Sequence, residues 1–295
     1  MSQLTKLAIE CVWMADAQLG EGPLWVEREQ ALYFVDLLAG LVHRFRPADG
    51  ACATFPQREA VGFVVPRIGG GFVAGAKSGF QFVDLESETT VPIAAPEAHL
   101  PNNRMNDGKV DSAERLWAGT MDLDCAAPSG SLYRLATDLS CVSVDSGYLC
   151  TNGPAFSRDG GILYHTDSMR RTIYAFDLDA ETGEIANKRV FVQLGDGDGY
   201  PDGMTVDSED RLWVAHFGGG RVTAFRTDGR IDRTIELPVP LATSCAFGGT
   251  GLRTLYITTA HLGLTPEQRA TAPLSGALLA VEDVAEGLPS PAFGG

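Results

Sequence analysis

Short apolar runs recur along the whole chain at a nearly constant spacing. Five of the six copies carry an aromatic residue directly after their first position, and the spacings are 40, 44, 47, 49 and 43 residues. A second apolar run follows each of them, and turn dipeptides such as Asp49-Gly50 and Asp159-Gly160 lie between the runs. Such runs, separated by turn residues, are typical of β-strands joined by tight turns. The six copies begin at Leu32, Phe72, Leu116, Leu163, Leu212 and Leu255.

Strands repeating about every 45 residues are the signature of a β-propeller with four short strands in each blade. Six units account for nearly the whole chain, so we predict an all-β, six-bladed propeller that forms a single domain over residues 1–295. The apolar run at residues 7–13 precedes the first unit and is expected to close the last blade as its outer strand. Closure of this kind removes an exposed sheet edge. The alternatives are a pair of all-β sandwiches and, less compatible with the missing helical periodicity, an α/β enzyme.

One position of the repeat changes its residue type from copy to copy. It lies 10 or 11 residues before each apolar run, where the first strand of a blade begins beside the central tunnel. A glycine follows it directly in four copies, which indicates a close-packed backbone turn, whereas in the third copy Asp107 intervenes before the glycine. These ring positions are Glu21, Val61, Asn106, Asn152, Asp202 and Ser244.

The ring positions predict a cation site at one mouth of the tunnel. Two carboxylates and two amides that converge there would repel each other or lack partners unless a cation lay between them. A divalent metal ion bound by oxygen atoms resolves this conflict. The alternative is a polar, water-filled tunnel mouth that holds no metal.

Further features belong to the same face of the predicted propeller. The loops at residues 121–130 and 261–276 are longer than their equivalents, as expected for walls or lids of a binding site. Arg104 precedes Asn106 by two residues and offers a fork of donors to a hydroxyl-rich or anionic ligand. His165 and His216 are expected to be packed, hydrogen-bonded side chains, with His216 the better placed for a function.

Composition narrows the partners. The chain has 295 residues and a net charge of −15, which argues against nucleic acid and anionic membranes as partners. The beginning of the sequence lacks the apolar core of a secretory signal, and no run approaches the roughly 20 apolar residues of a membrane span. The six cysteines are scattered without a Cys-x-x-Cys pair, so we expect reduced thiols and a cytoplasmic location.

Other catalytic motifs are missing from the sequence. It contains no Gly-x-Ser-x-Gly elbow, no His-Glu-x-x-His and no P-loop, so a serine hydrolase, a zincin protease and a P-loop nucleotide site lack support. The stretch at residues 196–207 is rich in aspartate and glycine, but Pro201 replaces the glycine that an EF-hand loop requires.

Several stretches of the chain resemble the SMP-30/gluconolactonase family, the regucalcin-like group that includes bacterial sugar lactonases. They run from one end of the sequence to the other, and their order makes the resemblance specific. The stretches are LGEGPLW (19–25), NNRMNDGKVD (102–111), RLWAGTMD (115–122), CTNGPAFS (150–157) and YPDGMTVDSEDRLWVA (200–215). Two more, YHTDSMRRTIYAFDLD (164–179) and NKRVFV (187–192), further resemble xylonolactonases.

This resemblance implies a six-bladed propeller with one catalytic divalent ion. In the matching positions Glu21, Asn152 and Asp202 would be the metal ligands, and Arg104 and Asn106 would bind substrate. Asp124 falls where many family members have an acidic substrate contact, although the local sequence here is MDLD. The resemblance favours Fe²⁺ or Ca²⁺, with Zn²⁺, Mn²⁺ or Mg²⁺ as further possibilities, because an all-oxygen ligand set does not distinguish among hard cations.

The expected activity is metal-dependent hydrolysis of a sugar lactone to the open-chain aldonic acid. The substrate would be a pentono- or hexonolactone such as xylonolactone, and Asp202 would act as general base on the attacking water. A small-molecule lactone would be the partner of a monomeric chain. Two alternatives are a hydrolase of another ester, such as an organophosphate or an acyl-homoserine lactone, and a non-enzymatic calcium-binding propeller.

Overall fold

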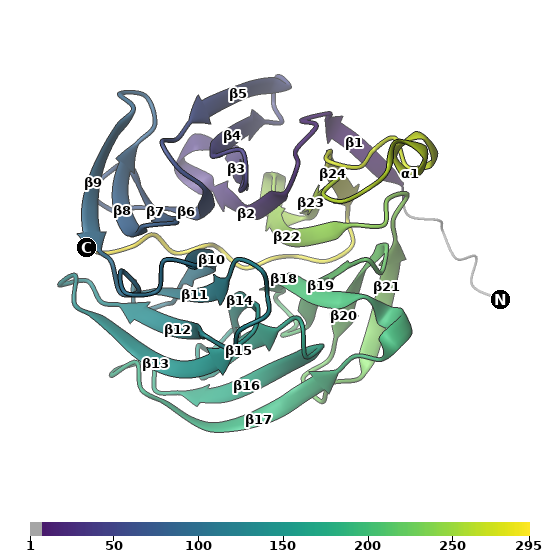
Figure 1. Cartoon of the computed structure of the whole chain (residues 1–295). Coiled ribbons are helices and arrows are strands. Elements are labelled where there is room, and N and C mark those ends of the chain that lie inside the picture. The colour runs from purple at the N-terminus through teal and green to yellow at the C-terminus, as the bar shows by residue number, and fades with distance from the viewer. Residues whose placement is uncertain (1–7) are drawn as a thin grey trace.

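The computed structural model describes residues 8–295, which form six four-stranded antiparallel sheets around a central axis (Figure 1). The first three blades, from inner to outer strand, are β2 (Gly20–Val26), β3 (Ala31–Asp36), β4 (Leu41–Arg46), β5 (Ala51–Pro56); β6 (Val61–Pro66), β7 (Phe72–Ala76), β8 (Gly79–Asp84), β9 (Thr89–Ala94); and β10 (Asn103–Val110), β11 (Leu116–Asp122), β12 (Gly130–Leu135), β13 (Cys141–Tyr148). The other three are β14 (Thr151–Phe156), β15 (Ile162–Asp167), β16 (Thr172–Leu178), β17 (Ile185–Gln193); β18 (Tyr200–Val206), β19 (Leu212–Phe217), β20 (Arg221–Phe225), β21 (Ile231–Glu236); and β22 (Ala242–Gly248), β23 (Thr254–Thr259), β24 (Leu278–Glu282), β1 (Ile9–Trp13).

The six-bladed propeller predicted from the repeat is confirmed, and the sandwich and α/β alternatives are wrong. Each of the six apolar runs forms the second strand of a blade. The side chains of these strands are buried on both faces between neighbouring blades, which explains why the runs are apolar. β1 pairs antiparallel with β24, with Ile9 opposite Val281, so the N-terminal strand closes the last blade as expected. Leu7, at the start of the predicted closing run, lies outside the described residues.

Every inner strand carries an irregularity at the ring position. The pairing with the second strand shifts register at the ring position or directly beside it in all six blades, for example between Glu21 and Leu24 and between Asn152 and Ala155. A β-bulge bends its strand and re-aims a side chain. The repeat therefore turns one residue of each inner strand out of the regular pleat where the strand begins.

Glycines allow the inner strands to approach one another at these bulges. A Cβ atom on Gly62 would lie 2.1 Å from the carbonyl oxygen of Asn106, which belongs to the next blade. Gly22 and Gly153 adopt positive φ angles of 52° and 76°, a conformation that glycine adopts without steric cost. Gly22 and Gly62 thus lie where the backbones of neighbouring blades come close, whereas Gly153 and Gly203 lie against the side chains of Met204 and Ser244 in the next blade.

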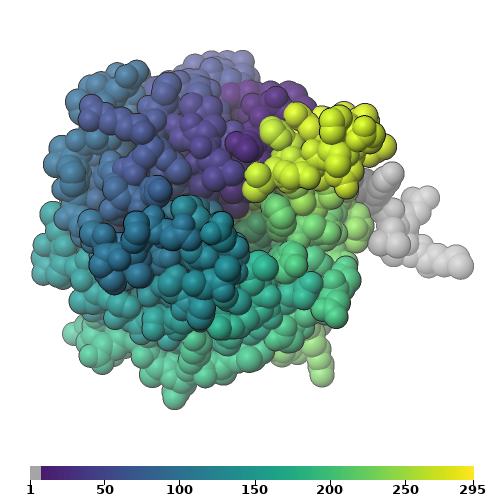
Figure 2. Space-filling model, in the orientation of Figure 1, coloured from purple at the N-terminus to yellow at the C-terminus, as the bar shows by residue number. Residues whose placement is uncertain are grey.

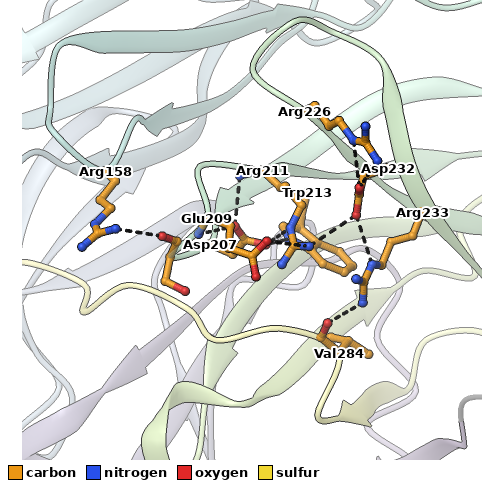
Figure 3. A network of polar contacts seen from close by, with 10 residues as sticks. Arg158, Asp207, Glu209, Arg211, Trp213, Arg226, Asp232, Arg233 and Val284 are labelled. Atoms are coloured by element: carbon orange, nitrogen blue, oxygen red, sulfur yellow. Dashed lines mark hydrogen bonds and ion pairs between the residues drawn. The ribbon is translucent and has the colours of Figure 1, made fainter.

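A buried ion-pair network holds the other end of two inner strands. Asp207 follows β18, and its Oδ2 accepts hydrogen bonds from Arg211 Nε at 2.7 Å and Trp213 Nε1 at 2.7 Å (Figure 3). Asp111 follows β10 and accepts equivalent bonds from Arg115 and Trp117. The repeated Asp-Ser-x-x-Arg-Leu-Trp sequence therefore builds the same turn twice.

The C-terminal segment at residues 284–295, here called the strap, crosses the propeller axis in Figure 1. Its residues line a cavity of about 220 Å³ with the carboxyl ends of the inner strands, so the strap covers the face opposite the ring positions. Phe293 is fully buried against the core of the second and third blades, and its backbone pairs with Arg67. Within residues 8–295, no helix is long and apolar enough to cross a membrane.

Candidate metal-binding and active site

The six ring positions all lie on inner strands and all six side chains are buried. Neighbouring inner strands contact one another in the order β2, β6, β10, β14, β18 and β22, so these residues surround one end of the axis. Four of them have a carboxylate or amide side chain: Glu21, Asn106, Asn152 and Asp202. The other two are Val61, which is apolar, and Ser244, which has a hydroxyl group. Residues from six separate blades therefore share one end of the propeller.

The two carboxyl groups of the ring interact unfavourably when both are charged. Burial raises the pKa of Glu21 to about 8, and the neighbouring negative charge of Asp107 adds to this shift. Burial also raises the pKa of Asp202 well above its ordinary value, with repulsion from Glu21 as the next cause. Without a cation, these side chains favour their protonated forms near neutral pH.

Arg104 lies within electrostatic reach of both carboxylates but does not neutralise them directly. Its guanidinium donates to the carbonyl oxygen of Met105 at 3.1 Å and to Asn106 Oδ1. Burial lowers the pKa of Arg104, while the attraction of Glu21 and Asp202 opposes this effect. Among the described residues, no arginine, lysine or histidine lies within hydrogen-bond distance of these two carboxylates. Their lone pairs are therefore available to a bound cation.

A chain of hydrogen bonds orients the two ring amides. Asn106 Nδ2 donates to the carbonyl oxygen of Thr151 and, at 3.1 Å, to Asn152 Oδ1. Asn152 Nδ2 donates in turn to Ser168 Oγ at 2.8 Å, and that hydroxyl donates to the carbonyl oxygen of Pro201 at 2.6 Å. These bonds fix the Asn152 amide so that its Oδ1 keeps one further lone pair for a ligand.

The hydroxyl group of Ser168, which orients Asn152, was not found by sequence reasoning. Ser168 follows β15 and lies outside the repeating ring position, so the periodic pattern carries no signal for it. Only the hydrogen bond to Asn152 reveals its part in the site.

Asp107 is a third buried acidic group beside the ring. From the sequence alone, either Asn106 or Asp107 could occupy the ring position of the third blade. Its oxygens accept hydrogen bonds from Gly108 N at 2.8 Å and from Gly153 N at 3.0 Å, which ties β10 to β14. Burial raises the pKa of Asp107 to about 6, and the nearby Lys109 opposes this shift. Asp107 therefore holds the backbone next to Asn152, and Asn106 is the residue whose side chain reaches that amide.

The donor set fits a hard divalent cation. Two buried carboxylates that repel each other and an amide oxygen with a free lone pair are the ligand types that Ca²⁺, Mg²⁺ or Fe²⁺ accept. Over the part of the chain that the structure describes, no group of three or more His, Cys, Asp or Glu side chains converges on one point. The expected set contains two such side chains and an amide, so it is an open site that water or substrate would complete.

A cavity of about 530 Å³ opens beside Arg104 on the same face of the propeller. Its wall combines apolar side chains, such as Leu100, Pro101 and Met105, with polar ones: Lys77, Glu97, Asn103, Arg104 and Thr120. This volume is within the range of small-molecule sites.

The two long loops stand on this face as expected. In Figure 2 the segment that contains α1 (Pro266–Thr271) forms a yellow rim at one side of the face. Asp124, on the loop at residues 121–130, is exposed, and its Oδ2 accepts a hydrogen bond from Asn102 at 3.4 Å. Asp124 therefore lies at the edge of the site and not among the buried ring residues.

Neither histidine singled out from the sequence joins the ring. His165 is fully buried with its ring packed edge-on against Tyr148, and burial lowers its pKa to about 3. Within the described residues its two ring nitrogens lack hydrogen-bond partners, so it is packed but not hydrogen-bonded. His216 is buried as well, and its Nδ1 contacts the carbonyl oxygen of Asp198 at 2.8 Å.

The whole length of the chain is similar to known proteins. The profile of the SMP-30/Gluconolactonase/LRE-like region matches residues 19–261, which include every ring position. The chain belongs to this family. The resemblance inferred from the sequence motifs is thereby confirmed.

The relatives match the chain over nearly its full length. Regucalcin of Danio rerio is 35% identical over 99% of this chain and 100% of its own length. A 6-deoxy-6-sulfogluconolactonase of Pseudomonas putida is also 35% identical, over 97% of this chain and 99% of its own. The crystal structure of a calcium-binding regucalcin of Agrobacterium tumefaciens superposes with a TM-score of 0.94 at 25% identity, covering 97% of each chain.

Proposed function

We propose that this chain is a sugar lactonase, a carboxylic ester hydrolase that holds one divalent cation with Glu21, Asn152 and Asp202. The observation that carries the proposal is the pair of buried, mutually repelling carboxylates at the start of two inner strands. Full-length similarity to a sulfogluconolactonase supports the reaction class. Similarity to a calcium-binding regucalcin supports the cation.

The cation's chemical contribution, when bound, is to polarise the lactone carbonyl and to stabilise the negative charge that develops on its oxygen. Because an oxygen-only donor set does not select among these cations, we propose Fe²⁺ or Ca²⁺ on the family resemblance, with Zn²⁺, Mn²⁺ and Mg²⁺ as further candidates. Glu21 and Asn152 serve as ligands, and the hydrogen bond to Ser168 keeps the Asn152 amide in place.

Asp202 accepts the proton of the attacking water as its oxygen adds to the carbonyl carbon. The bond between that carbon and the ring oxygen then breaks, and Asp202 returns the proton to the ring oxygen, which becomes a hydroxyl group. The product is the open-chain aldonic acid. Asp202 is an adequate base only when its charge is stabilised, because burial otherwise favours its protonated form.

Arg104 and Asn106 bind the hydroxyl groups of the substrate. Arg104 lines the cavity on the open face and keeps N–H groups free to donate. Both N–H groups of Asn106 donate to the protein, so Asn106 offers the substrate the remaining lone pair of its Oδ1 as an acceptor. The polar side chains in the cavity wall can hydrogen-bond the hydroxyl groups of a pentono- or hexonolactone such as xylonolactone, which is the substrate class we propose. We propose Asp124 as a substrate contact at the edge of the site, because its side chain is exposed and does not line the cavity. We further propose that the protein acts as a cytoplasmic monomer.

The test is acid release from a panel of xylono-, arabinono- and gluconolactone by the purified protein before and after chelation. We expect chelation to abolish turnover and the added divalent ion to restore it. Asp202→Asn should lower kcat by at least about 100-fold, the lower end of a general base's contribution. Metal analysis of that variant must show retained metal for the base assignment to stand.

Two outcomes would contradict the proposal. Full turnover by the chelated, metal-free protein would remove the cation from the reaction. Stoichiometric metal without hydrolysis of any lactone in the panel would favour a calcium-binding propeller that is not an enzyme.

A further inference from the structure

A lysine side chain reaches across the axis of the propeller between the ring positions and the strap. Lys109 belongs to β10 in the third blade, and its Nζ donates to the carbonyl oxygen of Met204 on β18, in the fifth blade, at 2.6 Å. The inner strand of the fourth blade, β14, lies between these two strands in the ring. The Lys109 side chain therefore extends into the tunnel, and its ammonium group lies near the axis.

Lys109 borders open space on both sides. Toward the ring positions, a narrow space of about 10 Å³ lies between Lys109, Asp107 and Ser244. This volume is about what one water molecule requires. Toward the strap lies the cavity of about 220 Å³, which Lys109 also lines. The lysine thus stands at the inner end of the cavity beneath the strap.

The ammonium group has fewer partners than it can bind. It carries three N–H donors, and among the described residues it makes one hydrogen bond, to Met204. Asp107, the carboxylate nearby, accepts instead from Gly108 N and Gly153 N. Burial lowers the pKa of Lys109, and the attraction of Asp107 opposes this shift without cancelling it. Two donors therefore remain for a ligand whose negative charge would stabilise the ammonium.

The wall of the cavity beneath the strap suits an anion that has an apolar body. Among the described residues that line it there is no aspartate or glutamate, and its two cationic side chains are Lys109 and Arg158. Most of the other lining side chains are apolar, and they include Leu24, Val65, Phe156, Phe247, Leu288 and Pro291. A cavity of about 150 Å³ is large enough for benzene, so this cavity can hold a benzene ring that carries a carboxylate.

The strap forms the outer cover of this cavity. Its backbone is hydrogen-bonded to the blades at Glu286 and at Phe293, on either side of the residues that line the cavity. Ser290 and Arg158 also line the cavity, and both are exposed. The wall therefore reaches the protein surface, and a small molecule can enter beside the strap.

We propose that this cavity binds a small organic monocarboxylate, which accepts hydrogen bonds from Lys109 and packs its apolar body between the inner strands and the strap. Hydrogen bonds between an ammonium and a carboxylate are among the stronger ones in proteins. An inorganic anion would occupy the lysine end alone and leave the apolar walls in contact with water. The site lies at the opposite end of the tunnel from the proposed cation ligands, and it does not depend on the lactonase proposal.

Isothermal titration calorimetry of the full-length protein with benzoate tests this proposal. We expect one equivalent to bind with a Kd below about 1 mM, which is a modest affinity for a ligand of this size. Benzyl alcohol keeps the ring without the charge, and sulfate carries charge without an apolar body. Each of these two should bind at least about 10-fold more weakly than benzoate, because each lacks one half of the interaction.

Lys109→Met removes the ammonium and keeps an unbranched side chain. It should weaken benzoate binding by about 10- to 100-fold, the usual effect of losing a hydrogen bond between charged groups. Lys188→Met is the matched control, because Lys188 lies on β17, the outer strand of the fourth blade, and it should leave the affinity unchanged. Thermal unfolding without benzoate shows whether each variant is folded.

A second measurement locates the ligand without any substitution. In methyl NMR spectra of the unaltered protein, benzoate should shift the methyl signals of Leu24, Val65 and Leu288, which line the cavity. The methyl signals of Leu264, in the long loop on the opposite face, should stay where they are.

Absence of benzoate binding would overturn the proposal, and so would unchanged affinity in a folded Lys109→Met variant. Sulfate binding as tight as that of benzoate would show a site for inorganic anions and overturn the assignment of a monocarboxylate. Methyl shifts confined to the face of the ring positions would place the ligand outside the cavity beneath the strap and overturn the proposal as well.

Discussion

At the scale of single residues, three buried carboxyl groups lie at one end of the tunnel and differ in the hydrogen bonds that they accept. Asp107 gives its oxygens to two backbone N–H groups, so hydrogen bonds satisfy it. Glu21 receives one weak bond, from its neighbour Gly22 N at 3.3 Å. The carboxylate with protein donors is structural, whereas the poorly satisfied Glu21 and Asp202 are the ones suited to a cation.

The raised pKa of Glu21 predicts a pH-dependent stability for the metal-free protein. The folded state binds a proton up to about pH 8, whereas the unfolded chain releases it near the ordinary value of 4.5. The folded state therefore holds more protons across this window, and the free energy of unfolding should fall as the pH rises through it. Asp202 acts in the same direction. Urea unfolding of the chelated protein at a series of pH values measures this dependence.

Glu21→Gln provides the comparison for that prediction. The metal-free variant should lose less stability between about pH 4.5 and 8, because it lacks one of the titrating groups. It should also bind the divalent ion more weakly than the unaltered protein. An identical pH profile in the two proteins would mean that Glu21 is ionised in the folded state without metal.

At the scale of strands and turns, the bulge in each inner strand is the device that creates the site. It needs glycine where adjacent blades touch, as at Gly62. The far end of two inner strands is held by buried Asp–Arg–Trp turns, which anchor the strands at that end. One end of the strand is thus shaped for ligands and the other for stability.

Gly62→Ala tests the close approach of two blades. The new Cβ would meet the carbonyl oxygen of Asn106 at 2.1 Å, so the backbone of β10 must move. We expect a loss of about 1–3 kcal/mol in the free energy of unfolding, as for other overpacked sites. Lactone turnover should fall as well, because Asn106 shifts. Gly197→Ala is the control, because a Cβ added at Gly197 would meet no atom within 4 Å, so this site should tolerate the change.

Asp207→Ala tests the buried turn shown in Figure 3. Removal of the carboxylate takes one partner from Arg211, which keeps Asp232 at 3.3 Å, and leaves Trp213 Nε1 without an acceptor. We expect the free energy of unfolding to fall by about 3 kcal/mol, the lower end for a broken buried ion pair, because the arginine stays paired. Urea unfolding measures the loss.

The matched control removes an ion pair of the surface. Asp49 pairs with Arg46 where both side chains are exposed, so Asp49→Ala should change stability little. Equal losses of stability from Asp207→Ala and Asp49→Ala would show that the buried turn contributes no more to the free energy of unfolding than the surface ion pair does.

At the scale of the whole molecule, the chain secures its ring at both termini. β1 completes the last blade by pairing with β24, so this blade contains segments from both ends of the sequence. The strap then crosses the face opposite the site and pairs with the second blade at Arg67. The two ends of the sequence therefore hold together blades that are distant along the chain.

Phe293→Ala tests the strap. Phe293 is fully buried and packs in the cluster that contains Phe63 and Val65. Its truncation should lower the free energy of unfolding by about 3–5 kcal/mol, the usual cost of a buried phenylalanine. Ser290→Ala, at an exposed position of the same strap, should have little effect. If the two variants unfold alike in urea, the strap does not contribute to the core.

The repeat in the sequence determined the number of blades, the second strand of each blade and the ring positions. These follow from periodic features, because a strand that is buried between two blades must be apolar wherever it recurs. The same periodicity is enough to place Glu21, Asn152 and Asp202 at one end of the axis. The metal-ligand role of these residues remains a prediction.

The tertiary structure alone decided the contacts between blades. The hydrogen bonds from Asn152 to Ser168 and from Gly153 N to Asp107 each join different segments of the chain. No period relates these residues. Their contacts depend on how far each bulge turns its side chain and on how closely glycine lets adjacent strands approach, which are distances in space and not positions in a repeat.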